Sequence, residues 1–177
     1  MKFVATPLAG AFVLEVDRHD DDRGGFARIY CAREFTEHGL DARIAQSSLS
    51  WNTARGTLRG LHYQVAPHAE SKTVRVVAGA IFDVMVDLRE ESPTRGQWFS
   101  TELSAANGRA LHIPAGFAHG FLTLADDSVV HYQISDFYVP DAGRGIRWND
   151  PQIAIAWPFA PTCISDRDRE LPYMATT

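Results

Sequence analysis

Residues 59–64, Arg-Gly-Leu-His-Tyr-Gln, combine side chains that acid–base chemistry on a phosphorylated ligand requires. Arg59 supplies a forked cation that suits phosphate oxygens, and His62 carries an imidazole that titrates near neutral pH. Lys72 adds a second cation a few residues later, at the start of an alternating apolar run. Together these residues predict a site that holds a phosphorylated substrate and removes a proton from carbon.

The elements that must position these side chains are short runs of β type, each bounded by turn residues. The predicted strands are residues 12–16, 26–30, 42–49, 57–64, 73–77, 81–88, 96–103, 110–113, 120–124 and 128–135. Residues 73–77 and 81–88 are expected to pair as a hairpin. One helix is expected over residues 32–38, ending at Gly39. About ten short strands with tight turns predict an all-β sandwich or barrel, as a single domain over residues 1–177.

The last part of the chain, residues 147–177, is rich in Pro and Trp and is expected to form an irregular tail. Trp148, Trp157 and Phe159 are expected to pin this tail to the body. Cys31 and Cys163 lie far apart and are expected to be buried, reduced thiols rather than a disulfide.

Composition excludes several classes of function. The net charge of −5 and the absence of a basic run argue against a nucleic-acid surface. No apolar stretch approaches the ~18 residues of a membrane span, and no apolar segment typical of a signal peptide opens the chain. A cytoplasmic location is therefore expected, without membrane partners.

A metal site is not expected, although residues 108–119 fit the second sequence motif of the cupins. In metal-binding cupins the histidine at the position of His119 is a ligand. The first motif would supply two more histidines, whereas here His62 is followed by Tyr63 and Gln64, and only Glu70 could serve as the carboxylate. Two nitrogen ligands fall short of the three protein ligands of a catalytic metal site, so both histidines remain available for proton chemistry.

The spacing of Arg59 and His62 poses a geometric conflict. Residues three apart on a regular strand point to opposite faces of the sheet. Either the strand carries a bulge, or Arg59 reaches around its end. Lys72 and Asp83 also lie on apolar strands, where an unpaired charge is costly, so a lined cavity is expected. Asp83 is expected to pair with Lys72 or a backbone amide.

Two ordered motifs identify a family: R-G-L-H-x-Q at residues 59–64 and P-x-G-x-x-H-G-F at residues 114–121. With residues 22–26 and 148–151, they make the chain resemble the dTDP-4-dehydrorhamnose 3,5-epimerase family over residues 17–172. The resemblance implies a cupin jelly roll without metal or other cofactor, usually a homodimer. It implies a nucleotide-linked 4-keto-6-deoxy sugar, with dTDP as the expected nucleotide, that is inverted at carbons 3 and 5 through an enolate.

The resemblance also implies catalytic roles for four residues. His62 matches the base, and Asp168 matches the carboxylate that orients it, with Asp166 as a competitor for that role. Tyr132 matches the acid on the opposite face of the sugar. Lys72 matches the group that faces the keto oxygen.

Eight further residues are expected to bind the substrate by the same resemblance. They are Arg23, Phe26, Arg28, Gln46, Ser48, Arg59, His119 and Tyr138. Ser48 stands where the family often has Asn, and Arg28 where it often has Glu, so the ligand is less defined than the chemistry. Arg28 and the N-terminal strands are candidates for reaching into the site of a partner subunit.

Four alternatives stand beside this interpretation. A C3-only epimerase would exchange protons at one carbon, and a 3,4-ketoisomerase would move the ketone. A non-catalytic sugar-binding cupin would bind ligand without any exchange. A metal-dependent oxygenase would contain stoichiometric iron.

Overall fold

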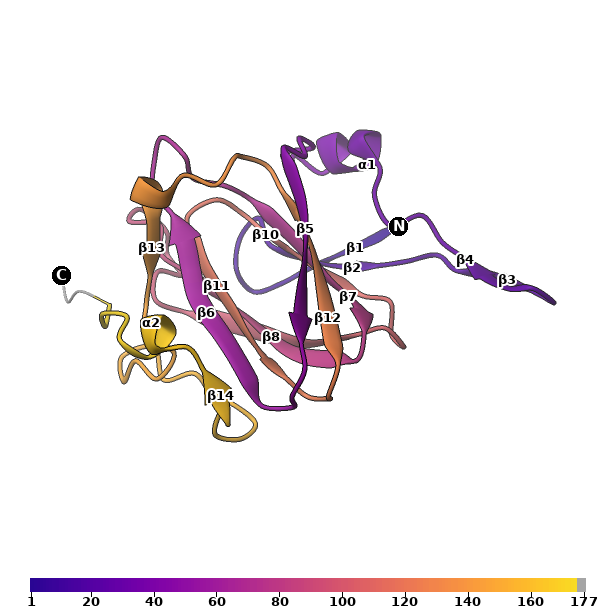
Figure 1. Cartoon of the computed structure of the whole chain (residues 1–177). Helices are drawn as coiled ribbons and strands as arrows, with labels where there is room; N and C mark the ends of the chain where they lie inside the picture. The colour runs from indigo at the N-terminus through magenta and orange to yellow at the C-terminus, as the bar shows by residue number, and fades with distance from the viewer. Residues whose placement is uncertain (175–177) are drawn as a thin grey trace.

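Two antiparallel β-sheets face each other in the computed structural model, which describes residues 1–174 (Figure 1). The first sheet has the order β1 (Lys2–Ala5), β2 (Phe12–Glu15), β10 (Ala110–Ile113), β7 (Lys72–Ala78), β12 (Ser128–Ile134) and β5 (Gln46–Asn52). The second has the order β13 (Gly143–Gly145), β6 (Thr57–Gln64), β11 (Phe117–Thr123), β8 (Ala80–Asp87) and β9 (Trp98–Ser104), and β14 (Cys163–Ile164) runs parallel to β6.

The remaining elements are small. β3 (His19–Asp21) and β4 (Gly24–Phe26) form a separate hairpin that extends away from the body (Figure 1). The helices are α1 (Ala32–Glu37), the 3-10 turn η1 (Pro140–Ala142) and α2 (Asp166–Arg169). The expected all-β jelly roll of the cupin type, with a few short helices, is therefore confirmed.

The main core lies between the two sheets because the strands alternate apolar side chains toward that space. The first sheet contributes Val74, Val76, Leu111 and Val130, among others, and the second contributes Met85 and Phe121. This apolar layer fixes how far apart the two sheets stand.

The tail covers the outer face of the second sheet, where Ile153, Ile155 and Trp157 pack on Leu61 and Val84. The Trp157 indole N–H donates to the Trp148 carbonyl at 2.8 Å, and the Arg55 guanidinium lies 4.0 Å from the centre of the Phe159 ring. The expectation that aromatic residues pin the tail to the body is confirmed for Trp157 and Phe159, whereas the contact of Trp148 is made by its backbone carbonyl to another residue of the tail. The tail also carries β14 and α2, which the sequence pattern did not predict.

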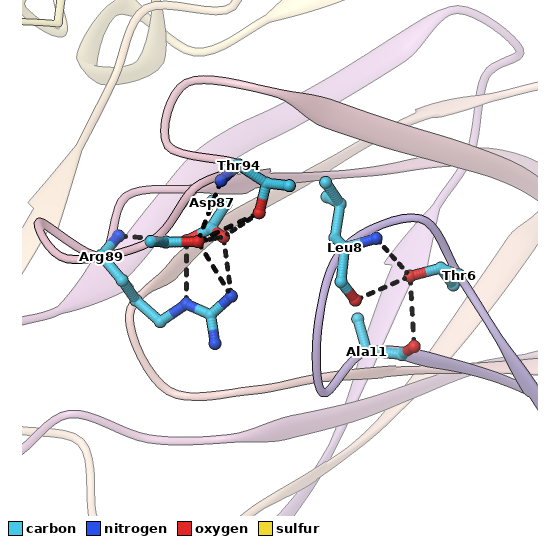
Figure 2. Close-up of polar contacts among 7 residues, drawn as sticks. Thr6, Leu8, Ala11, Asp87, Arg89 and Thr94 are labelled. Atoms are coloured by element: carbon cyan, nitrogen blue, oxygen red, sulfur yellow. Dashed lines mark hydrogen bonds and ion pairs between the residues drawn. The ribbon is translucent and has the colours of Figure 1, made fainter.

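Two polar networks fix turns of the jelly roll (Figure 2). The buried Asp87 carboxylate, at the end of β8, accepts hydrogen bonds from Arg89, Ser92 and Thr94 at 2.6 to 2.9 Å. Burial acts to raise the pKa of Asp87, but these donors lower it to about 2. Between β1 and β2, the Thr6 hydroxyl accepts from the Leu8 N–H and lies 3.1 Å from two carbonyl oxygens, as Figure 2 shows.

The predicted hairpin of residues 73–77 and 81–88 is wrong. β7 belongs to the first sheet and β8 to the second, and the chain crosses between the sheets at Gly79, whose φ is +73°. A Cβ at Gly79 would lie 2.4 Å from the Ser128 hydroxyl. A short turn can connect two strands of the same sheet or two strands of different sheets, and the local sequence does not distinguish these cases.

Three further local predictions need correction. Residues 27–30 form no strand, because the hairpin ends at Phe26 and the chain then runs to α1, where Tyr30 packs near Phe35. The strand predicted over residues 42–49 instead spans Gln46–Asn52. Cys31 and Cys163 are both free, as expected, but Cys163 is exposed and Cys31 only partly buried.

Candidate active site

A cavity of about 460 Å³ opens between the two sheets, and both sheets contribute polar side chains to it. β6 and β11 of the second sheet form one wall, and β5, β7 and β12 of the first form the other. α2 lies at its rim. The lining residues with polar or ionisable side chains are Ser48, Ser50, Arg59, His62, Lys72, His119, Tyr132, Ser165, Arg167 and Asp168.

A β-bulge in β6 brings Arg59 and His62 to the same cavity. In the pairing with β11, His62 lies opposite His119 and Arg59 opposite Phe121, so three steps on β6 match two on β11. The first of the two explanations offered for this spacing is therefore correct. Gly60 allows the bulge because its φ is +121° and a Cβ there would lie 2.5 Å from the Gly120 Cα.

His62 and Asp168 form a dyad at the rim. The His62 Nε2 lies 2.7 Å from the Asp168 Oδ1, and the Gly60 N–H donates to Oδ2 at 3.1 Å. Burial acts to raise the pKa of Asp168, but the bonds from His62 and Gly60 lower it overall. The Ser165 hydroxyl caps α2 by accepting from the Asp168 N–H. Asp168 therefore faces His62 as a carboxylate, whereas Asp166 is exposed and makes no such contact.

Tyr132 reaches the cavity from β12 in the first sheet, the wall opposite His62. Burial raises the pKa of Tyr132 far above its ordinary value, the charge of Asp83 adds to this effect, and Arg59 opposes it. The phenol therefore keeps its proton at neutral pH. Its ring meets that of His119 edge to face, with the centroids 6.0 Å apart.

Asp83 pairs with His119 rather than with Lys72, so that expectation is wrong. The His119 Nε2 lies 2.7 Å from the Asp83 Oδ1, and both side chains are buried. β8 and β11 are neighbours, with Asp83 opposite Phe121 and only two residues from His119 in the register. Burial raises the pKa of Asp83, although His119 opposes the rise.

Lys72 pairs with Glu70, a residue that was expected only as a possible metal ligand. Its Nζ lies 2.8 Å from the Glu70 Oε1. Lys72 and His62 also line a second cavity of about 280 Å³, together with Tyr138 and Arg144. Arg167 lines both cavities, and its place between Asp166 and Asp168 in the sequence was the signal that could have identified it.

Five predicted binding residues do not line the main cavity in the single chain, and one of them, Tyr138, lines the smaller cavity; the five are Arg23, Phe26, Arg28, Gln46 and Tyr138. Arg23 pairs with Asp21 on the projecting hairpin (Figure 1), and the Phe26 side chain at its end is 76% exposed. Arg28 pairs with Glu34 of α1 at 3.3 Å.

Gln46 stands at the start of β5, where its Oε1 accepts from the Tyr138 N–H at 2.7 Å. Ser48, two residues along β5, lines the main cavity and lies opposite Tyr132 in the register. The structure thus brings Ser48, Arg59 and His119 together with the four predicted catalytic residues.

Within residues 1–174, no group of three or more His, Cys, Asp or Glu side chains is arranged to hold a metal ion. No helix in the same part of the chain is long and apolar enough to cross a membrane.

Comparison with known proteins agrees with the resemblance seen in the motifs. The family model described as dTDP-4-dehydrorhamnose 3,5-epimerase matches residues 5–176. The enzyme of that name from Methanothermobacter thermautotrophicus is 43% identical over 171 residues, which cover 95% of this chain and 91% of that protein.

Two solved structures extend the comparison to the fold. The dTDP-4-dehydrorhamnose 3,5-epimerase of Bacillus anthracis, with TDP and PPi bound, is 42% identical with a TM-score of 0.94 and covers 98% of this chain and 99% of that one. A 3'-monoepimerase from Streptomyces bikiniensis, in complex with dTDP-quinovose, is 34% identical with a TM-score of 0.88, over 95% and 85% of the two chains. With its motifs, fold and cavity all in agreement, the chain belongs to the dTDP-4-dehydrorhamnose 3,5-epimerase family.

Proposed function

We propose that the protein inverts carbons 3 and 5 of dTDP-4-dehydro-6-deoxy-D-glucose to give dTDP-4-dehydro-L-rhamnose. Membership of the family supports this activity, and so does the TDP bound by the related Bacillus anthracis enzyme. The observation that carries the proposal is a single cavity with a carboxylate-backed imidazole on one sheet and a partly buried phenol on the other.

His62 acts as the base in this proposal. The Asp168 carboxylate accepts the proton on Nε2, so neutral His62 has Nδ1 as its free basic nitrogen. Protons on carbons 3 and 5 lie beside the keto group and are weakly acidic, so Nδ1 removes each in turn to leave an enolate. Asp168 stabilises the imidazolium that results, and a well-placed base of this kind contributes roughly 10²- to 10⁴-fold.

Tyr132 and Lys72 complete the reaction. The phenol returns a proton to carbon from the opposite wall, so the configuration inverts. The Lys72 ammonium faces the keto oxygen and stabilises its developing negative charge.

Arg59 holds the diphosphate. Its Nε donates to Asn52 and its Nη2 to the Trp51 carbonyl, so the protein holds the guanidinium in place while Nη1 stays available to phosphate oxygens. Ser48 and His119 line the same cavity as sugar contacts.

The decisive experiment incubates the protein with dTDP-4-keto-6-deoxyglucose in deuterium oxide and counts the labelled carbons by NMR. We expect deuterium at carbons 3 and 5 and an L-configured product. His62→Ala should reduce exchange at both carbons by roughly 10²-fold or more. Exchange by His62→Ala at the wild-type rate would show that another group is the base.

A C3-only epimerase is the second candidate, because the Streptomyces bikiniensis 3'-monoepimerase shares the fold and 34% of the sequence. It predicts deuterium at carbon 3 alone in the same experiment. A ketone at a new carbon would instead indicate a 3,4-ketoisomerase.

A homodimer and a cytoplasmic location complete the proposal. β5 ends the first sheet as an edge strand, and edge strands invite pairing with a second copy. The exposed hairpin of β3 and β4 would carry Arg23 and Phe26 toward the partner's cavity, which accounts for their distance from the cavity of their own chain.

A further inference from the structure

The contact between Glu70 and Lys72 is a short, enclosed ion pair at the wall between the two cavities. The Lys72 Nζ lies 2.8 Å from the Glu70 Oε1, and the two side chains are only 14% and 4% exposed. Lys72 lines both cavities, whereas Glu70 lines only the smaller one. Glu70 therefore contacts the ammonium from the side away from the main cavity.

The backbone around this pair is fixed. Ser71, which separates the two residues, donates its N–H to the Ser135 hydroxyl at 2.9 Å, and its carbonyl accepts from the Ser135 N–H at 3.0 Å. Lys72 itself begins β7, opposite Ile113 on one side and Ile134 on the other. The backbone on both sides of Ser71 is therefore tied to β12 and to Ser135, which places the Glu70 carboxylate beside the Lys72 ammonium.

The electrostatics of the pair indicate that it does more than stabilise the fold. Among the described residues, the buried Glu70 Oε2 has no hydrogen-bond partner. A buried carboxylate with one unpaired oxygen contributes little to stability, because its desolvation offsets much of the attraction to its partner. Its main effect is on the orientation of Lys72, because it holds one of the three N–H donors of the ammonium and leaves the other two free for a ligand.

We infer that Glu70 is a positioning residue for the reaction, acting through Lys72. It holds the ammonium at a fixed point in an enclosed site, so that the free N–H donors meet the enolate oxygen without reorganisation. This inference rests on the proposed function, because it assigns Lys72 to the keto oxygen.

The test is a double-mutant cycle of Glu70→Gln and Lys72→Met, measured by deuterium exchange. Glutamine keeps the size of the side chain and an acceptor oxygen but removes the charge. Glu70→Gln should lower kcat roughly 10- to 100-fold, the effect expected for a misplaced catalytic group, with less than a threefold change in KM. In the Lys72→Met background the same change should have no further effect on kcat, because there is no ammonium left to hold.

A matched control and an independent readout accompany the cycle. Asp87→Asn removes a charge from another ion pair, which lines neither cavity, and should lower stability but leave kcat unchanged. Acylation of Lys72, followed by peptide mass spectrometry, should be at least threefold faster in Glu70→Gln, since the Lys72 side chain is then no longer held by a carboxylate in an enclosed ion pair.

Wild-type kcat in Glu70→Gln, or additive losses in the cycle, would overturn the inference and leave the proposed function standing. Wild-type protein that incorporates no deuterium would contradict the proposed function itself. The acylation rate would then still show whether Glu70 holds the Lys72 side chain in place.

Discussion

The proposed base, His62, and the proposed acid, Tyr132, stand on different sheets, so their substitution should have different consequences. In Tyr132→Phe, His62 can still remove a proton and return a deuteron to the same face, since its side chain is 39% exposed and exchanges with solvent. We therefore expect deuterium in recovered substrate of unchanged configuration, while formation of the inverted product falls roughly 10²- to 10⁴-fold.

NMR of the recovered sugar separates these two outcomes. Tyr30→Phe, which alters a phenol near α1, is the matched control and should leave inversion unchanged. Inverted product at the wild-type rate from Tyr132→Phe would show that Tyr132 is not the acid.

The residues that line the main cavity could be predicted where they belong to a family motif. His62, Lys72, Tyr132 and Asp168 all line it. The side chains that pair with cavity residues could not be predicted, because the pairing depends on which strands become neighbours. Asp83 reaches His119 only because β8 pairs with β11, and the sequence pattern had placed β8 beside β7.

Among the strands, β6 depends most on a glycine. Gly60→Ala should lower the free energy of unfolding by roughly 3 kcal/mol, because a methyl group would meet the Gly120 Cα at 2.5 Å in a strained backbone. Urea unfolding measures this loss. Gly39→Ala is the control, since Gly39 also has a positive φ but open space around its Cβ position. Equal losses in both variants would mean that the close approach of β6 and β11 is unimportant.

The loop after β8 should give the protein an acid-sensitive component of stability. The pKa of Asp87 is lowered from 3.8 to about 2 on folding. Its contribution is therefore complete above about pH 4 and disappears as the pH falls through about 2. Asp87→Asn should cost roughly 1 to 2 kcal/mol at pH 7, and the difference from wild type should narrow below pH 4.

Urea unfolding at several pH values tests this prediction. Asp20→Asn, in an exposed pair with Arg18, is the control and should change stability little at any pH. A difference between wild type and Asp87→Asn that stays constant down to pH 2 would contradict it.

Element boundaries were predictable where alternation was strong and turns were marked by Gly or Asn. β6 and β10 coincide with the predicted residues. The errors include β4 and β5, where polar residues border the strands, and β11, which begins at Phe117 rather than at residue 120. β1, β3 and β13 were not predicted, and neither was the change of sheet at Gly79. Such a crossover is decided by packing across the core, which no local pattern encodes.

For the whole molecule, the proposed homodimer makes a prediction about an exposed aromatic. Trp51 lies at the end of the edge strand β5 and is 67% exposed, beside Val129 of β12 in the register. A tryptophan at an interface commonly contributes 2 kcal/mol or more. Trp51→Glu should therefore raise the dimer dissociation constant by on the order of 30-fold.

Sedimentation equilibrium over a range of concentrations measures this constant. Tyr173→Glu, which changes an exposed aromatic on the tail, is the matched control and should leave association unchanged. A dimer that is equally tight in Trp51→Glu would place the interface on another face.

The two-sheet cavity has a consequence for how this catalyst tolerates change. The proposed proton acceptor and proton donor stand on separate sheets, and the distance between those sheets is set by core side chains such as Val76 and Met85, which do not line the cavity. Interior volume is thus a kinetic parameter. We expect the removal of a methyl group from this core layer to slow turnover before it causes measurable unfolding.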